Sequence, residues 1–249
     1  NILQSYGGGC HQKIGSSVEV LKTGLVKTTK GETEEGENIS KRFFVANVDN
    51  NSFFSEVSNE NYFPANKNEQ SFFKRLAIKE AENELEKIKN KGIYVSRSNA
   101  LESHVKIDDS NIIWTSGVDT WISLARKGFW INGTSDSLGE NNSPGENPFG
   151  SINWLKLSHV DAKNSNNNTI ATYKLEPLEI DNRIQSCEYF YWMSASSFKL
   201  AVEYFPEILI KKHSCGLGST YDFINSMIPE NTFPCLNYDS WLEQIKANH

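Results

Sequence analysis

Positive charge is scarce in this sequence, which holds 25 Lys and Arg against 31 Asp and Glu, for a net charge of −6. A nucleic-acid-binding protein needs a basic field to collect phosphates, so the net charge argues against this class. An acidic small molecule remains a possible ligand. It would have to be bound by locally placed Lys, Arg or backbone N–H groups.

Paired cysteines and long apolar runs are also missing. The four cysteines, at positions 10, 187, 215 and 235, form no C-x-x-C pair, which argues against a zinc site and against a disulfide framework. The five histidines show no metal-like spacing, so no metal site is predicted. No apolar run approaches the roughly 18 residues that span a bilayer, and no signal peptide is visible. We expect reduced thiols, a cytoplasmic location and no membrane partner.

Hydrophobic residues make up 38% of the sequence and aromatic residues 12%, enough for a packed core. The length allows one large domain or two ordinary ones. The chain begins at Asn1 and runs directly into a glycine cluster. This beginning indicates an internal start, and the sequence leaves open whether further domains lie upstream.

The first part of the chain predicts a small α+β domain. Residues 16–28 and 42–48 are rich in β-branched and aromatic residues and predict strands, with a polar turn at 31–36 between them. Apolar residues at helical spacing predict a helix over 70–91, ended by Gly92.

After Gly92 short strands alternate with helices. This alternation predicts a parallel, doubly wound α/β sheet with helices on both faces. The predicted strands are 93–96, 111–115, 129–131, 170–175, 189–193 and 213–215. The predicted helices are 116–127, 196–204 and 219–227.

Two segments of this second part resemble each other. Ile113–Leu124 and Lys212–Ile224 each give a strand, a glycine turn, a hydroxyl residue at a helix start and an aromatic residue. Such a turn presents backbone N–H groups and a positive dipole end to an anion. Both segments are equally compatible with ordinary strand–helix connections, in which the hydroxyl residue caps the helix.

The sharpest motif is the segment Gly7–Gly15, GGGCHQKIG. Three glycines beside Cys10 favour an exposed loop where a bulky group has room, while the alternative is a small buried cysteine in a turn. With the following residues 16–26, the segment resembles the carboxy-terminal domain of porphobilinogen deaminase (hydroxymethylbilane synthase). In that family a Gly-Gly-Cys-x-x-Pro-Ile-Gly loop carries the dipyrromethane cofactor on its cysteine, which would here be Cys10. Lys13 stands where the family usually has proline.

The second part resembles a reduced uroporphyrinogen-III synthase. Thr169–Pro177 is similar to the family's linker between its two halves. Tyr189–Phe198 and Ser214–Tyr221 are similar to its glycine- and hydroxyl-rich strand-to-helix turns. The two resemblances divide the chain into a cofactor-attachment domain, residues 1–91, and a synthase-like domain, residues 92–249. The two families catalyse consecutive steps of tetrapyrrole (porphyrin and haem) biosynthesis.

The resemblance implies a lyase that closes hydroxymethylbilane into uroporphyrinogen III, with inversion of ring D and loss of water. Tyr173 matches the family's tyrosine and would assist departure of the hydroxyl group; the alternative is an aromatic side chain packed in the linker. Hydroxyl residues at helix starts would hold the substrate's carboxylates, with helix capping as the alternative. They are Ser116, Thr120, Ser194, Ser196, Ser219 and Thr220.

The synthase reaction needs no cofactor, and dipyrromethane on Cys10 is expected only if upstream deaminase domains assemble it. Deaminase activity is not expected from this chain alone, since nothing in 92–249 resembles the family's catalytic Asp and Arg residues. Two alternatives to a cyclase remain. The rear domain could bind the linear tetrapyrrole without catalysis, or the chain could be the end of a deaminase whose catalytic domains lie upstream.

Overall fold

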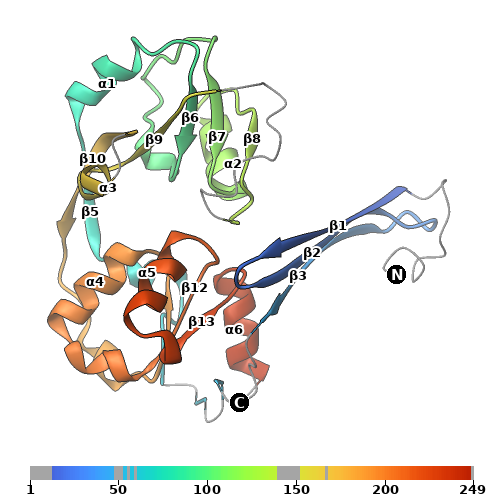
Figure 1. Ribbon diagram of the computed structural model, residues 1–249, viewed down its shortest axis with the longest axis vertical. Coiled ribbons are helices and arrows are strands. Elements are labelled where there is room, and N and C mark those ends of the chain that lie inside the picture. The colour runs from blue at the N-terminus through green and yellow to red at the C-terminus, as the bar shows by residue number, and fades with distance from the viewer. Residues whose placement is uncertain are drawn as a thin grey trace.

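The computed structural model describes residues 13–47, 53–54, 57–58, 61–138, 152–165 and 168–247. They form a mixed α/β protein with three sheets: a projecting arm and two lobes stacked one above the other (Figure 1). The strands are β1 Lys13–Leu21, β2 Gly24–Glu32, β3 Asn38–Ala46, β4 Tyr62–Phe63, β5 Phe73–Ala77, β6 Gly92–Val95, β7 Ile112–Thr115, β8 Gly133–Thr134, β9 Trp154–His159, β10 Thr169–Pro177, β11 Tyr189–Trp192, β12 Lys212–Cys215 and β13 Thr232–Pro234. The helices are α1 Lys79–Leu85, α2 Val118–Arg126, α3 Val160–Ser165, α4 Ala195–Tyr204, α5 Ser219–Met227 and α6 Tyr238–Ala247.

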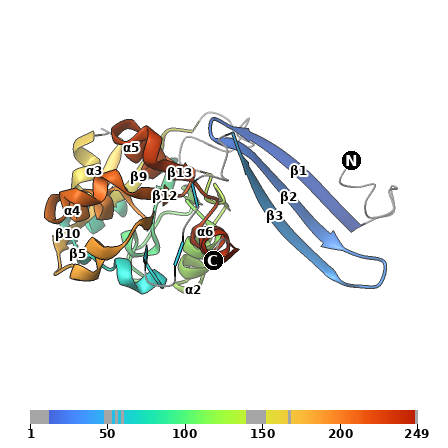
Figure 2. The same cartoon turned by 90° about the horizontal axis from the view of Figure 1, so that it is seen from below.

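The arm is an antiparallel sheet, β1-β2-β3, that extends away from both lobes (Figure 2). The prediction of a single strand over residues 16–28 is wrong. The strands β1 and β2 meet within this segment in a tight turn, where Gly24 adopts a φ of 152°. An added Cβ at Gly24 would lie 2.1 Å from the Val45 carbonyl oxygen, so only glycine fits. Val26 is buried at the base of the arm, in a cluster with Leu138, Leu217 and Leu236.

The second lobe, residues 61–72 and 178–247, surrounds the all-parallel sheet β13-β12-β11-β4. Successive side chains of a strand point to opposite faces. Phe190 and Trp192 of β11 accordingly join a core cluster with α4 and α5. Tyr189 and Tyr191 join another with α6. The parallel strands and the helices on both faces, predicted from the sequence, are present in this lobe.

The first lobe, between residues 78 and 168, contains β6, β7, β8 and β9, which run parallel to one another and to β10. Its core joins α1 and α2 to the apolar strand residues Ile93, Val95 and Leu157. On the other face, Trp114 and Trp154 pack edge to face at 6.4 Å. Each ring covers a glycine of the neighbouring strand, Gly133 and Gly92.

Two strands connect the lobes. β5 leads from the second lobe to the first and β10 leads back, paired antiparallel from Phe73↔Pro177 to Ala77↔Tyr173. This ladder corrects the helix predicted over 70–91: residues 73–77 are a strand, and helix α1 occupies only 79–85. Phe73 and Leu76, three residues apart, have helical spacing and lie on opposite faces of the strand. Pairing with β10, and not apolar periodicity, determines the strand.

Two further expectations do not match the structure. Residues 129–131 are not a strand; the chain reaches the sheet edge at β8, residues 133–134. The predicted division between residues 91 and 92 does not separate the sheets, because β4 pairs with β11 and β5 pairs with β10 across it. The segment 61–91 thus contributes to both lobes, while the arm, residues 13–47, has a sheet of its own.

Candidate functional site between the lobes

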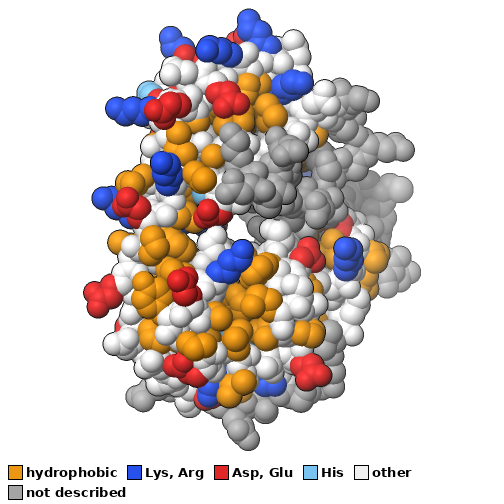
Figure 3. Space-filling view, turned by 60° about the vertical axis from the view of Figure 1, so that its left-hand side comes forward, with side chains coloured by type: hydrophobic (Ala, Val, Ile, Leu, Met, Phe, Trp, Pro, Cys, Tyr) orange, Lys and Arg blue, Asp and Glu red, His pale blue; other side chains and the backbone are white. Residues whose placement is uncertain are grey.

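The carboxyl ends of the two parallel sheets face each other. β10 points toward the second lobe, and β6, β7 and β9 run in the same direction. Arg97, just beyond β6, reaches across and donates from Nη2 to the carbonyl oxygen of Met193, just beyond β11, at 3.0 Å. Ligands of α/β proteins bind outside the carboxyl ends of parallel strands. The space-filling view shows a hollow between the lobes (Figure 3).

Tyr173 lies on the connecting strand β10, at this junction. The pairing of β10 with β9 shifts register between Ala171 and Tyr173, so Tyr173 lies opposite His159. Such bulges re-aim side chains. Tyr173 is buried, and the side chains of Ser158 and Arg75 lie near enough to its hydroxyl group to lower its pKa.

The charge state of Tyr173 follows from its surroundings. Burial raises the pKa of the Tyr173 hydroxyl above its ordinary value, while the positive charges of Arg97 and Arg75 oppose that shift. The hydroxyl group therefore holds its proton at neutral pH. The two guanidinium groups would stabilise the phenolate left after a proton transfer. This combination suits a proton donor.

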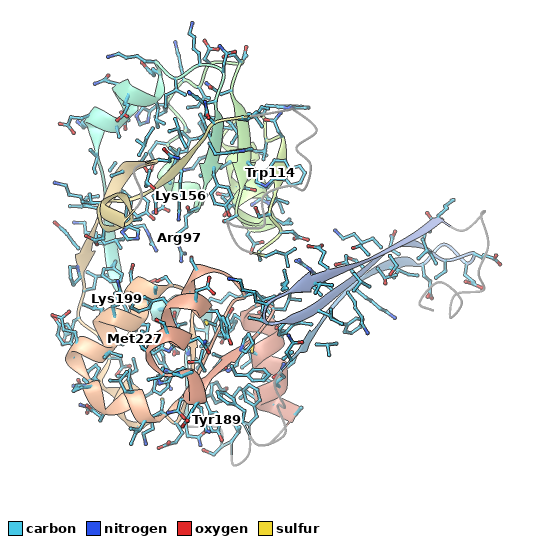
Figure 4. The ribbon with its side chains drawn as sticks, viewed as in Figure 1. Arg97, Trp114, Lys156, Tyr189, Lys199 and Met227 are labelled. Carbon is cyan, nitrogen blue, oxygen red and sulfur yellow. The ribbon has the colours of Figure 1, made fainter. Side chains whose placement is uncertain are left out.

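Arg97 and Arg75 approach the tyrosine from different elements. Burial lowers the pKa of the Arg97 guanidinium, and the positive charge of Arg75 adds to that shift. Arg75 belongs to β5, two residues before Ala77, the ladder partner of Tyr173, so Arg75 and Tyr173 lie on the same face of the ladder. Figure 4 shows Arg97 extending from the first lobe toward the second.

His159 completes the cluster. Its ring centroid lies 5.9 Å from that of Tyr173, and its Nδ1 is 3.7 Å from the Asp161 carboxylate. Burial lowers the pKa of His159, while Asp161 opposes the shift. The imidazole is therefore neutral at neutral pH.

Gln70 stabilises the part of the second lobe that borders the site, at the carboxyl end of β11. Its side-chain amide donates to the Tyr191 carbonyl oxygen, and its Oε1 accepts from the Met193 backbone N–H at 2.9 Å. Gln70 is buried. It therefore fixes the carbonyl group that Arg97 contacts.

The hydroxyl residues predicted from the sequence follow the carboxyl ends of β7, β11 and β12, on the sides where the lobes face each other. Ser194 caps α4: its Oγ accepts from the Ser197 backbone N–H at 3.1 Å. Ser116 donates from Oγ to the Ser96 carbonyl oxygen at 2.7 Å. Ser219 begins α5 and is exposed. Thr120, Ser196 and Thr220 lie in the first turns of α2, α4 and α5 and are partly buried.

Cys10, the predicted attachment residue, lies outside the described residues. Among the residues that the structure describes, no group of three or more His, Cys, Asp or Glu side chains is arranged to hold a metal ion.

The sequence patterns did not single out Arg75, Arg97, Ser158 or His159 as site residues. The one available signal was position: Arg97 and His159 stand where short apolar strands end, which is the binding edge of a parallel sheet. Arg75 carried no signal, because its segment was predicted to be helical.

The fold and the junction thus define a two-lobed α/β protein with a polar site between its lobes. No protein-family model and no curated protein sequence matches this chain. No helix within the described ranges is long and apolar enough to cross a membrane.

Proposed function

We propose that this protein closes a linear tetrapyrrole, hydroxymethylbilane, into uroporphyrinogen III. The observation that carries the proposal is the position of Tyr173. It lies on a strand that connects the lobes, between the facing carboxyl ends of two parallel sheets, with Arg75 and Arg97 beside its hydroxyl group. β10 has the residue range of the segment whose sequence resembles the linker of uroporphyrinogen-III synthases.

The reaction begins with loss of the terminal hydroxyl group as water. Tyr173 donates its proton to that oxygen as the C–O bond breaks, which leaves a phenolate and an azafulvene cation. The substituted carbon of ring D attacks this cation and gives a spiro intermediate, which rearranges and closes the ring with ring D inverted. The final loss of a ring proton returns Tyr173 to its protonated form. Overall, one water molecule is released.

The protein must also fold a flexible chain so that its two ends meet. Holding reacting atoms together removes a large part of such a barrier. The lobes supply opposed rows of hydroxyl groups and helix starts, with Ser116 and Thr120 on one side and Ser194, Ser196, Ser219 and Thr220 on the other. Helix starts bind carboxylates through backbone N–H groups, even where a hydroxyl group also caps the helix.

The arm belongs to a different part of the proposal. Because β1 follows directly on the segment that resembles the deaminase's cofactor loop, we assign the arm to a deaminase tail with Cys10 as its attachment residue. The cyclase would then be the rear part of a bifunctional protein. Intact mass tests this assignment: a dipyrromethane adduct on Cys10 is expected when upstream deaminase domains are produced with the chain, and Cys10→Ser would abolish it.

The cyclase is tested by supplying freshly made hydroxymethylbilane and separating the uroporphyrin isomers after oxidation. Isomer III above the spontaneous isomer I background is the expected result. If only isomer I forms, the catalytic proposal is wrong. The alternative is then a non-catalytic tetrapyrrole-binding domain behind a deaminase.

A further inference from the structure

Arg97 and Arg75 are two cations at the lobe junction for which the described structure contains no ion-pair partner. The ion pairs found elsewhere on the molecule involve other Lys, Arg and His residues. Surface arginines often lack a partner without consequence. Arg97 is partly buried and Arg75 is exposed, but both act on the same tyrosine hydroxyl group, and the positive charge of Arg75 raises the electrostatic cost of the Arg97 charge.

The hydrogen bonds of Arg97 leave it able to bind a ligand. A guanidinium has five N–H donors, and one from Arg97 is used by the Met193 carbonyl oxygen. Within the described structure, neither Nε nor Nη1 of Arg97 is a buried nitrogen without a partner, so both keep contact with solvent. The bond to Met193 also fixes the guanidinium plane across the junction.

The charges around this pair favour an anion. Lys156 of β9 acts on His159 together with Arg97, and both lower the pKa of the imidazole. Asp161, an acid beside this cluster, faces His159 with a carboxylate that is 78% exposed. From the second lobe, Lys199 of α4 lies over the Phe223 ring, 4.4 Å from its centroid. Figure 4 shows Lys199 on the side of α4 that faces the first lobe.

We infer that Arg97 and Arg75 form a carboxylate-binding subsite beside Tyr173, which takes an acid side chain of the ligand that lies between the lobes. Planar guanidinium groups bind carboxylates through paired, charge-assisted hydrogen bonds. A carboxylate here contacts the first lobe through Arg97 and the connecting ladder through Arg75, and holds its ring close to the Tyr173 hydroxyl group. Naming that ligand a tetrapyrrole rests on the proposed function; the carboxylate subsite does not.

Binding of tricarballylate, a small tricarboxylate, tests the subsite without the cyclase reaction. Calorimetric titration of the wild type, Arg97→Gln and Arg75→Gln should show about tenfold weaker binding in each variant, the loss of one charge-assisted contact. Arg97→Lys should keep part of the affinity. Arg126→Gln is the matched control, because Arg126 is an exposed arginine of the same lobe at the far end of α2; it should bind as the wild type does.

The inference is overturned if the wild type does not bind tricarballylate, if Arg97→Gln and Arg75→Gln both bind it unchanged, or if Arg126→Gln loses as much. If Arg97→Gln disturbs the lobe junction, the Arg75→Gln variant still tests the subsite. Arg75 lies at an exposed position of β5, where a substitution leaves the fold intact.

The isomer assay separates this inference from the proposed function. If the wild type forms isomer III, Arg97→Gln should raise KM for hydroxymethylbilane about tenfold. Tricarballylate binding lost in both variants, with only isomer I formed by the wild type, supports the subsite and refutes the cyclase. Isomer III formed with unchanged KM and unchanged tricarballylate binding supports the cyclase and refutes the subsite.

Discussion

At the scale of single residues, Tyr173 shows how one side chain can combine opposite influences. Burial raises the pKa of its hydroxyl group and so favours the protonated form, while two guanidinium groups stabilise the phenolate that forms when the proton is lost. A tyrosine on the surface would have neither influence. The same side chain also packs in the core of the first lobe, so the linker-packing alternative raised by the sequence and the proposed catalytic role are compatible.

Replacing Tyr173 by phenylalanine removes the proton donor and keeps the ring. We expect formation of isomer III to fall about 100-fold in kcat, in line with the loss of one general acid, with the far-ultraviolet circular dichroism unchanged. Tyr204→Phe is the control, because Tyr204 is 58% exposed at the end of α4. Equal rates in the two variants would exclude Tyr173 as the donor.

His213 is a second informative residue, remote from the junction. Trp192 Nε1 donates to its Nδ1 at 2.9 Å, so the ring proton is on Nε2, which faces the Ile208 carbonyl oxygen at 2.8 Å. The imidazole is buried and stacks against Phe190, with ring centroids 5.2 Å apart. A second proton on Nδ1 would break the bond from Trp192. Burial accordingly lowers the pKa of His213 to about 4.

The stability of the protein should therefore depend on His213 in acid. The folded-state pKa is about 4 and the ordinary value is 6.5. Between these values the unfolded chain binds the extra proton, so stability is complete above pH 6.5 and falls as the pH drops toward 4. The loss is about 3 kcal/mol. Urea unfolding at several pH values checks it. His213→Gln should be less stable at pH 7 and show a shallower decline; an unchanged slope would contradict the assignment.

The sequence could indicate the residue types of the site but not its full membership. Tyr173 and the hydroxyl residues stand in recognisable strand-end patterns, and the structure places them at the facing edges of the lobes. Arg75 and Arg97 are separated by a helix and a strand along the chain, and they meet at Tyr173 only because β5 pairs with β10. Such a cluster depends on long-range pairing, which local periodicity does not encode.

At the scale of elements, the local sequence pattern predicted best those helices that pack one apolar face against a sheet. The helix predicted over 219–227 has the bounds of α5, and the one predicted over 196–204 differs from α4 by one residue. The helix predicted over 70–91 is wrong in its first part because the apolar spacing there fits a helix. The strand that pairs with it, β10, lies about a hundred residues further along the chain and could not be inferred from the local pattern. Pairing between elements overrides weak local preference.

The first lobe offers a test of packing between adjacent strands. At Gly133 of β8 an added Cβ would lie 2.2 Å from Cζ3 of the Trp114 ring, and the indole Nε1 of Trp114 also donates to Ser135 Oγ at 3.3 Å. Gly133→Ala must displace this ring, so we expect a loss of about 1–3 kcal/mol in the free energy of unfolding.

Urea unfolding measures the effect, with a shift in tryptophan fluorescence as the structural signature. The control is Gly216→Ala at the end of β12, where the added Cβ meets only Tyr191 Oη at an ordinary 3.7 Å; it should change stability by less than about 0.5 kcal/mol. Equal losses in both variants would show that the Trp114 contact is not the cause.

At the scale of the whole molecule, the arm, the lobes and the ladder have different roles. The ladder β5–β10 sets the separation of the lobes, and Arg97 bridges them on the inner side. The arm contacts both lobes at its base through Val26, against Leu138 of the first lobe and Leu217 and Leu236 of the second. The arm therefore restricts movement of the two lobes relative to each other, because its base packs against both of them.

A charged contact links the arm to the first lobe. Arg42 of β3 donates from Nη1 to the Asp136 carbonyl oxygen at 2.6 Å and pairs with the Asp136 carboxylate at 3.1 Å. Its side chain is only 20% exposed. Breaking such a partly buried pair leaves Asp136 without its cation, which costs more than loss of a surface pair.

Arg42→Gln should therefore loosen the arm while the lobes stay folded. We expect amide hydrogen exchange to become at least tenfold faster across β2 and β3, because local opening then costs less, with little change in β11 and β12. Lys30→Gln, on an exposed position of β2, is the matched control and should exchange as the wild type does. Faster exchange throughout the lobes would instead mean that the arm and the lobes unfold as one unit, so that Arg42 stabilises the whole molecule rather than the attachment of one sheet.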